Sequence, residues 1–283
     1  MKAQLFFLCL LVTGYVQMQA QTVRGTVLHA ETQEALPFVT IGIPGKGIGT
    51  VAQADGSFTL RLDDALPGDT IRISMIGFAT EWRKAGDWKN QTNIQITLSP
   101  LDQQLEALVV RPTNRKTFFA GNDFDKPFVQ VGFVGDAEDT TVVNPPGAEL
   151  GTIMRVKKNK KHYLDSCGIN MSQFTPDSAI LRINFYQIVD DEPSLLLNTK
   201  PVYATLYKGQ SKLVIDLRPY NITADNDFVM AIEWLVDLKG KQETVLFCGG
   251  FVGAGIRYRE VSEGKWKKAP IGIAMWCAGE RDV

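Results

Sequence analysis

The sequence predicts an all-β protein that consists of two β-sandwiches, a small one followed by a larger one. Short segments along most of the chain alternate apolar and polar residues with a period of two, which is typical of strands with one buried and one solvated face. Turn pairs such as Pro44-Gly45, Asp55-Gly56 and Pro67-Gly68 separate these segments in the first third. No amphipathic helix of ten or more residues is visible there, so strands at close spacing favour sandwiches.

Length and composition fit this class. The chain has 283 residues, of which 45% are hydrophobic and 22% are charged, and its formal net charge is −1. Such a chain can bury a core of useful size and is long enough for two domains. The near-neutral balance gives no electrostatic footprint for nucleic acid.

The N-terminus has the organisation of a signal peptide. Lys2 precedes an apolar run at residues 5–12, and the small residue Ala20 followed by Gln21 offers a cleavage position. Eight apolar residues are too few to cross a bilayer core of about 30 Å as a helix, which needs about 20. No later segment is apolar enough to span a membrane. We therefore expect export to the periplasm or the outer membrane, with no transmembrane segment after cleavage; an uncleaved anchor is the alternative.

The alternating segments divide the chain into a signal peptide (1–20), a first sandwich (21–100), a linker (101–126) and a second sandwich (127–283). Pro112, in a polar stretch, marks the boundary because it discourages regular structure before it. In the first sandwich we expect strands at 23–28, 38–43, 57–62, 70–75 and 93–98.

The second half predicts a larger, jelly-roll-like sandwich. In its most regular segment, Leu181, Ile183 and Phe185 occupy one face and polar residues occupy the other. We expect strands at 128–134, 151–156, 163–171, 179–189, 212–217, 228–238, 244–252, 256–260 and 271–277.

Several motifs of the first sandwich occur together in a known order. They are the opening strand at 23–27, the segment from Thr32 through 35–41, the pair 49–51 and 55–60, and the strand at 73–78. In this combination, residues 22–100 resemble the carboxypeptidase-regulatory-like family of transthyretin-like sandwiches. In that family the domain stands beside metallopeptidase domains or precedes TonB-dependent transporters. Residues 105–110 resemble the segment before a transporter plug, but too few residues follow for a transporter barrel. The resemblance implies a short exported form without peptidase or barrel.

The residues needed for catalysis are scarce. A zinc peptidase needs two His and a Glu around its metal, whereas this chain has only His29 and His162, and neither has a suitably spaced Glu. No G-x-S-x-G elbow occurs. The glycine-rich segment 42–49 lacks the Ser or Thr of a phosphate loop and predicts a flexible turn instead. We therefore predict no catalytic, cofactor-binding or metal-binding residues, and no cofactor.

Three carboxylates in or near apolar strands leave one enzymatic alternative open. Asp216, Glu233 and Asp237 could provide the pair that a glycosidase needs. Glu233 lies between Ile232 and Trp234, so the alternation predicts that it points to solvent.

Trp266 is the best candidate for stacking against a ligand. It follows Gly264 and lies between Lys265 and Lys267, which favours exposure. A structural role is the favoured alternative for this tryptophan. After signal cleavage three cysteines remain, each in an apolar stretch, and we expect buried free thiols, with one disulfide as the alternative. They are Cys167, Cys248 and Cys277.

Together these observations predict a non-enzymatic exported module that binds or scaffolds components of the bacterial cell envelope. Its expected partner is an envelope protein or glycan. A carbohydrate-binding protein and a glycosidase that uses carboxylates of the second domain are the alternatives.

Overall fold

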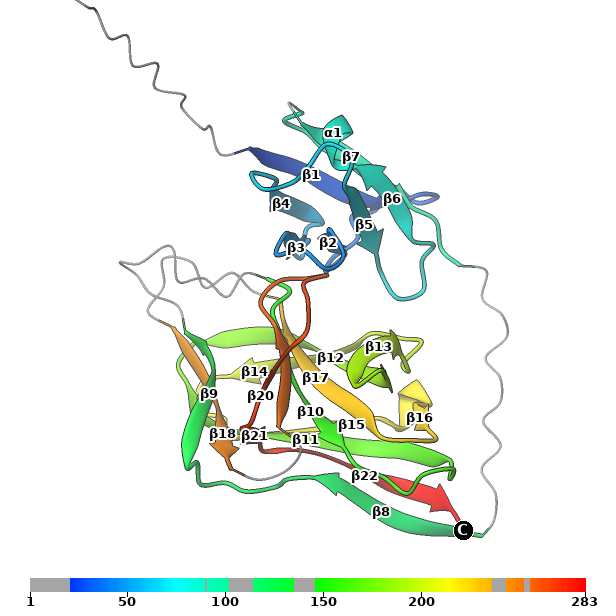
Figure 1. The fold of residues 1–283 in the computed structure, drawn as a ribbon, viewed down its shortest axis with the longest axis vertical. Coiled ribbons are helices and arrows are strands. Elements are labelled where there is room, and N and C mark those ends of the chain that lie inside the picture. Colours follow the sequence, from blue (N-terminus) through cyan, green and yellow to red (C-terminus); the bar gives the residue numbers. More distant parts are fainter. Residues whose placement is uncertain (1–20, 90, 102–113, 135–145, 236–242, 252–254) are drawn as a thin grey trace, which may run out of the picture.

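The computed structural model describes residues 21–89, 91–101, 114–134, 146–235, 243–251 and 255–283. Almost all of its regular structure is strand, arranged as two domains that follow one another along the chain (Figure 1). The all-β class and the sandwich architecture predicted from the alternation are confirmed.

The first domain is a sandwich of a three-stranded and a four-stranded sheet. In the smaller sheet, β1 pairs with β4 in the antiparallel and with β7 in the parallel sense. A short helix, α1 (Ala85–Trp88), follows β6. The smaller sheet contains β1 (Thr22–His29), β4 (Ser57–Arg61) and β7 (Ile94–Leu98), and the larger contains β2 (Thr40–Gly42), β3 (Gly49–Val51), β5 (Thr70–Ser74) and β6 (Glu81–Lys84).

The predicted alternation decides which side chains fill this first core. In β4, Phe58 and Leu60 are buried, while Thr59 between them is exposed. In β5, Ile71 and Ile73 are buried in the same way. Side chains from both sheets form one apolar cluster, which burial of apolar surface stabilises.

The second domain is a larger sandwich of a seven-stranded and an eight-stranded sheet. The seven-stranded sheet contains β10 (Glu149–Met154), β12 (Ser178–Val189), β13 (Glu192–Leu196), β14 (Val202–Tyr207), β17 (Phe228–Trp234), β19 (Ile256–Arg259) and β20 (Lys267–Ala269). The eight-stranded sheet contains β8 (Arg115–Gly121), β9 (Val129–Val134), β11 (His162–Phe174), β15 (Lys212–Asp216), β16 (Thr223–Ala224), β18 (Thr244–Gly250), β21 (Gly272–Ile273) and β22 (Met275–Asp282).

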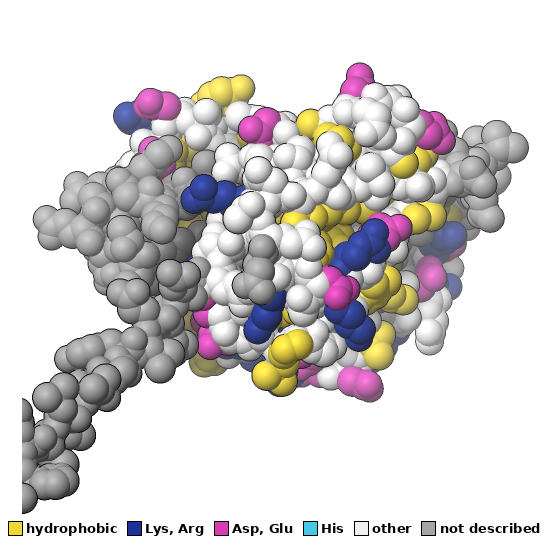
Figure 2. All heavy atoms as spheres, turned by 90° about the horizontal axis from the view of Figure 1, so that it is seen from above, with side chains coloured by type: hydrophobic (Ala, Val, Ile, Leu, Met, Phe, Trp, Pro, Cys, Tyr) yellow, Lys and Arg dark blue, Asp and Glu magenta, His cyan; other side chains and the backbone are white. Residues whose placement is uncertain are grey.

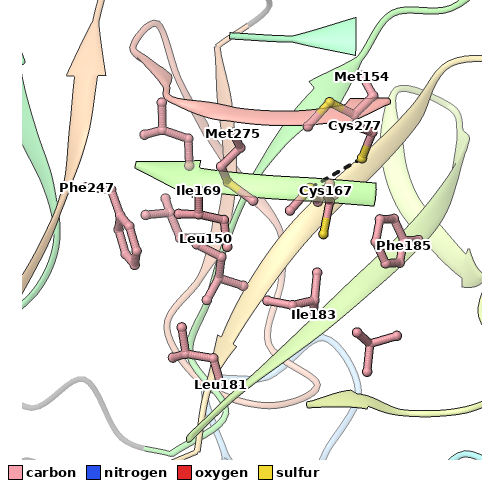
Figure 3. Packing of buried hydrophobic residues seen from close by; sticks show 14 of the residues in the cluster. Leu150, Met154, Cys167, Ile169, Leu181, Ile183, Phe185, Phe247, Met275 and Cys277 are labelled. Atoms are coloured by element: carbon pink, nitrogen blue, oxygen red, sulfur yellow. Dashed lines mark hydrogen bonds between the residues drawn. The ribbon is translucent and has the colours of Figure 1, made fainter. Parts of the chain in front are cut away.

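The second core lies between these two sheets. Leu181, Ile183 and Phe185 of β12 point into it, as the sequence predicts, and meet Ile169 and Met275 from the opposite sheet (Figure 3). This apolar cluster shares no residue with the apolar cluster of the first domain. Each sandwich therefore has its own core.

The three mature cysteines are buried free thiols, as expected. Cys167 of β11 and Cys277 of β22 are direct cross-strand neighbours and both point into the second core (Figure 3). Burial raises the pKa of each of these two thiols. The Cys277 Sγ lies 3.5 Å from the sulfur of Met230, so it packs as a small apolar group.

The segment expected to be a linker contains one strand. β8 lies within 101–126 and pairs with β22 at the edge of the eight-stranded sheet. Its sequence, with Lys116 and Thr117 among apolar residues, alternates over only a few positions, and tertiary pairing with β22 decides its structure. None of the helices in the described part of the chain is long and apolar enough to cross a membrane.

Candidate functional site

The second sandwich has two outer faces, and they differ in what covers them. We call the outer face of β10, β12, β17 and β19 the covered face, because its central side chains are buried. We call the outer face of β8, β22, β11 and β15 the open face. Figure 1 shows β8 and β22 at the end of the second domain that lies away from the first domain.

The covered face holds buried charged groups at its centre. Arg182 of β12 and Glu233 of β17 are cross-strand partners. Their side chains form a bidentate ion pair, with Nε and Nη2 of the arginine each 2.8 Å from a carboxylate oxygen. Asn184 donates a third hydrogen bond of 2.8 Å to the same carboxylate. Only 1% of the Glu233 surface is exposed, so the prediction that this residue points to solvent is wrong: it leaves the core as expected, but other parts of the protein cover it.

A second buried pair lies directly beside the first. Glu149 of β10 is the cross-strand partner of Glu233 and accepts hydrogen bonds from Arg259 and from the Tyr186 hydroxyl, the latter at 2.9 Å. Burial raises the pKa of Glu149, and the positive charge of Arg259 opposes this shift. Each buried carboxylate therefore has its own arginine, as burial of charge requires.

The first domain is one of the elements that cover this face. Arg182 reaches across the domain boundary and donates hydrogen bonds of 2.8 Å to the Phe38 carbonyl and the Thr40 hydroxyl. Phe38 has a φ of 59°, an uncommon conformation for a bulky residue. Its ring lies 5.3 Å from the ring of Tyr203 in β14. The same buried arginine therefore neutralises Glu233 and holds the first domain.

The loop between β19 and β20 makes a second contact between the domains. The Gly45 N–H donates to the Glu263 carbonyl at 2.8 Å, and Arg72 pairs with the Glu263 carboxylate at 2.9 Å. The Ser262 carbonyl lies so close to Gly49 that a Cβ there would come within 2.0 Å of it. The glycine-rich segment 42–49, expected to be a flexible turn, is thus a hairpin whose glycines admit the backbone of the second domain.

Trp266 ends this same loop and lies half-buried on the covered face. Its ring meets Tyr186 edge-on at 5.6 Å, and the Arg259 guanidinium lies 4.9 Å from its centre. It also packs on the small apolar group of Tyr186, Val229 and Ala231. These contacts favour the structural alternative for Trp266, because they cover part of the ring that a ligand would need.

The open face presents aromatic and small side chains together. Phe119 of β8 is 56% exposed and stacks on Trp276 of β22, with ring centres 5.6 Å apart. The indole of Trp276 lies over Gly168 of β11, where a Cβ would come within 2.2 Å of it. Val214 of β15, beside Gly168, is 57% exposed. Trp276 is buried, but on the side of β22 that faces away from the second core.

Polar side chains border this aromatic surface. Lys212 pairs with the Asp123 carboxylate at 2.8 Å, and the Asn170 amide donates to the same carboxylate at 2.9 Å. The hydrogen bond from Lys212 is the main cause that lowers the pKa of Asp123, and Asn170 and Trp276 contribute. Neither Asp123 nor Asn170 is marked by a sequence motif, because the pairing of β11 with β15 and the chain after β8 bring them together.

The carboxylates considered for glycoside hydrolysis do not share a site. Asp216 is exposed at the end of β15 and pairs with Arg218 at 2.7 Å. Glu233 lies on the other sheet, so the second core separates the two residues. Asp237 lies outside the described residues. Glu233 does have a carboxylate neighbour in Glu149, but both are buried and paired with arginines.

The other residues singled out in the sequence are far apart. His29 lies in the first domain and accepts backbone N–H groups with its Nδ1, whereas His162 is buried in the second, with Nδ1 2.7 Å from the Lys160 carbonyl. Within the described ranges, no group of three or more His, Cys, Asp or Glu is placed to hold a metal ion. Ala20 lies outside those ranges, and the carbonyl of Gln21 accepts a hydrogen bond from the Leu62 N–H.

Comparison with known proteins names the first domain. A family model described as the CarboxypepD_reg-like domain matches residues 23–110. The first sandwich is a CarboxypepD_reg-like domain. The resemblance seen in the sequence is confirmed, and the match extends about ten residues past the predicted end of the first sandwich.

One curated relative has the CarboxypepD_reg-like domain as part of a much longer chain. TonB-dependent receptor P3 of Formosa agariphila is 34% identical over 110 residues. The match covers 39% of this chain and 10% of the receptor's length.

Two solved structures are similar over most of the chain, but at low scores. One contains the cysteine protease and lectin-like domains of Cwp84, a surface layer associated protein of Clostridium difficile, with a TM-score of 0.37, 8% identity, and 87% of this chain and 59% of that chain covered. The other is a putative carbohydrate binding protein from Bacteroides uniformis, with a TM-score of 0.23, 11% identity, and 89% and 97% covered. Both scores are too low to indicate a shared fold.

Proposed function

We propose that this protein is a non-enzymatic, exported binding or scaffolding module of the bacterial cell envelope. The main support for this proposal is that buried charged side chains of the second sandwich join it to the first domain. Arg182, which is held by its buried ion pair with Glu233, donates to the Phe38 carbonyl and the Thr40 hydroxyl and so joins the CarboxypepD_reg-like domain to the second sandwich. The charged side chains on the covered face therefore join the two domains and do not line an open cleft. The open face remains available to a partner.

The envelope location rests on two further observations. The N-terminal sequence has the organisation of a signal peptide, with cleavage expected between Ala20 and Gln21. The relative that shares the first domain is a TonB-dependent receptor. Mass spectrometry of the protein from fractionated cells tests this step. A mature N-terminus at Gln21 in the periplasmic or outer-membrane fraction is expected, and an intact N-terminus in the cytoplasm would contradict it.

The surface seen from the side of the first domain does not indicate a polyanionic partner. Lys and Arg side chains alternate there with Asp and Glu, among hydrophobic groups (Figure 2). This agrees with the net charge of −1. Recognition by shape, apolar contact and hydrogen bonding is therefore favoured over attraction between large charges.

The binding function is tested by capture of defined envelope components. Full-length mature protein on beads is incubated with outer-membrane vesicles, purified peptidoglycan and soluble envelope polysaccharides from its source cells. An equally loaded exported β-sandwich of unrelated sequence is the control. At least one component should be retained above the control. Retention of none, or turnover of a captured glycan or peptide, would contradict a non-enzymatic binding module.

Carbohydrate binding at Trp266 is a weaker candidate, supported by the partial exposure of that ring. Its contacts with Tyr186 and Arg259 give the same ring a packing role. Trp266→Ala separates the two roles. Loss of glycan binding at unchanged stability would support a ligand site, whereas loss of stability alone would support packing.

A further inference from the structure

We propose that the open face of the second sandwich binds a neutral oligosaccharide, with one sugar ring on Phe119 and the hydroxyls of a neighbouring sugar unit hydrogen-bonded to Asp123 and Lys212. This proposal deepens the proposed function, because it names the ligand class and the surface that an envelope module would use. It places the site on the opposite sheet from Trp266.

The aromatic platform is built into the sheet. Cross-strand pairing puts Gly121, Trp276, Gly168 and Val214 in one row of four adjacent strands. Gly168 leaves room for the indole, because a side chain at this position would collide with it. Phe119 then stacks on the indole, with an angle of 24° between the rings. The sheet thus holds one exposed ring face in a fixed orientation.

A fixed and exposed ring is suited to an apolar surface of similar size. The faces of a pyranose ring carry C–H groups, which pack on the electron-rich face of an aromatic ring. Phe119 lies in the next row of cross-strand neighbours. Its neighbours in that row, Ala278 and Ser166, have small side chains. A ring lying on Phe119 therefore meets no bulky side chain in that row until Asp216, on the fourth strand.

The polar border matches hydroxyl groups. Asp123 and Lys212 are both partly exposed, with 36% and 45% of their side chains accessible, and they offer an acceptor and a donor side by side. Asn170 is 3% exposed, and its amide nitrogen donates to the Asp123 carboxylate and to the Phe124 carbonyl. Asn170 therefore positions the Asp123 carboxylate and does not itself face a ligand. Hydroxyls both donate and accept, so they suit this mixture.

Charge selects a neutral ligand over an ionic one. Lys212 is paired with Asp123, and Arg218 is paired with Asp216 at the other end of β15. These four charges on β15 and beside it are matched in pairs, so they leave no excess charge next to the platform that would attract an anion or a cation. An acidic polymer would have to displace an existing carboxylate from its lysine.

The test measures binding of full-length mature protein by affinity gel electrophoresis. The gels contain laminarin, xylan or galactomannan as neutral probes and alginate or polygalacturonate as acidic probes. Phe119→Asp puts a charge on the platform without changing a core residue. Phe128→Asp is the matched control, because Phe128 is 86% exposed and lies just before β9, outside the four strands that form the open face. Asp123→Ala removes the polar border alone.

At least one neutral probe should retard the wild type and the Phe128→Asp variant equally. Phe119→Asp should weaken that retardation at least tenfold, and Asp123→Ala at least threefold, while both keep the thermal unfolding temperature of the control variant within a few degrees. Retardation by none of the neutral probes, retardation by acidic probes alone, or unchanged binding of Phe119→Asp would overturn the proposal.

The result also separates this inference from the proposed function. If Phe119→Asp binds the neutral probes as the wild type does and still retains the envelope component, the open face is not the saccharide site and the binding module remains. If the wild type captures no envelope component but binds a neutral probe through Phe119, the saccharide site remains and the envelope role fails.

Discussion

The two outer faces of the second sandwich carry similar kinds of side chain but differ in how deeply these side chains are buried. Each has charged and aromatic residues at alternating positions next to apolar core residues. On the covered face, the CarboxypepD_reg-like domain and the loop carrying Trp266 exclude water, and Arg182 and Glu233 become a buried ion pair. On the open face, Lys212 and Asp123 form a similar pair that stays accessible. Burial, and not residue type, turns one face into an interface and leaves the other free for a ligand.

The largest expected effect comes from leaving one buried charge without its partner. Glu233→Gln keeps the shape of the side chain but leaves the Arg182 charge uncompensated. Breaking a buried pair in this way costs about 3–5 kcal/mol of unfolding free energy. Urea denaturation should show this loss.

The matched variant on the open face is Asp216→Asn, because Asp216 is exposed and paired with Arg218. Water solvates either partner there, so the urea midpoint should hardly move. Equal urea midpoints for the two variants would mean that water reaches the ion pair on the covered face. The two faces would then not differ in burial.

The contact between the domains is tested at its closest point. Gly49→Ala adds a Cβ that would come within 2.0 Å of the Ser262 carbonyl. Overpacking of this kind costs about 1–3 kcal/mol, and small-angle scattering should show a larger radius of gyration as the domains separate.

Gly47→Ala, two residues away in the same hairpin, is the control, since nothing lies within 4 Å of its added Cβ. It should behave as the wild type in both measurements. An unchanged radius for both variants would show that the hairpin does not set the distance between the domains.

Trp266→Ala should have a smaller effect on stability. The substitution removes a half-buried ring from Tyr186 and Arg259, and we expect a loss of about 1–2 kcal/mol from lost packing and cation–π contact. Glycan binding should stay at the wild-type level if the open face carries it. A loss of glycan binding without a change in thermal unfolding would return the ligand site to the covered face.

The smallest effects are the opposite pKa shifts of carboxyl groups on the two faces. Hydrogen bonds from Arg218 lower the pKa of Asp216 to about 2, so its stabilising pair is complete above pH 3.8 and is lost as the pH falls toward 2. Burial raises the pKa of Glu149, so the folded state binds that proton more tightly, and its contribution to stability falls as the pH rises above 4.5. Carbon-13 NMR titration of the two carboxyls measures both directions, and shifts of the same sign would contradict the comparison.

Much of the fold follows from the sequence because a strand displays its periodicity directly. The alternation in β12 put Leu181, Ile183 and Phe185 in the core. Some strands were not predicted from this alternation. β13 and β14 follow β12 without a clear alternation of apolar and polar residues, and β8 lies in the segment expected to be a linker. Such strands depend on their partners, since pairing and burial outweigh local preference.

The sequence by itself determined which side of each strand faces the core and that the first domain is a carboxypeptidase-regulatory-like sandwich. It also located the loop that bears Trp266. The tertiary structure alone decided what covers each outer face, because alternation separates the two sides of a strand but carries no information about what packs on the outer one. Glu233 was expected to meet water and meets Arg182, whereas Phe119, in the segment expected to be a linker, is stacked and exposed on the open face.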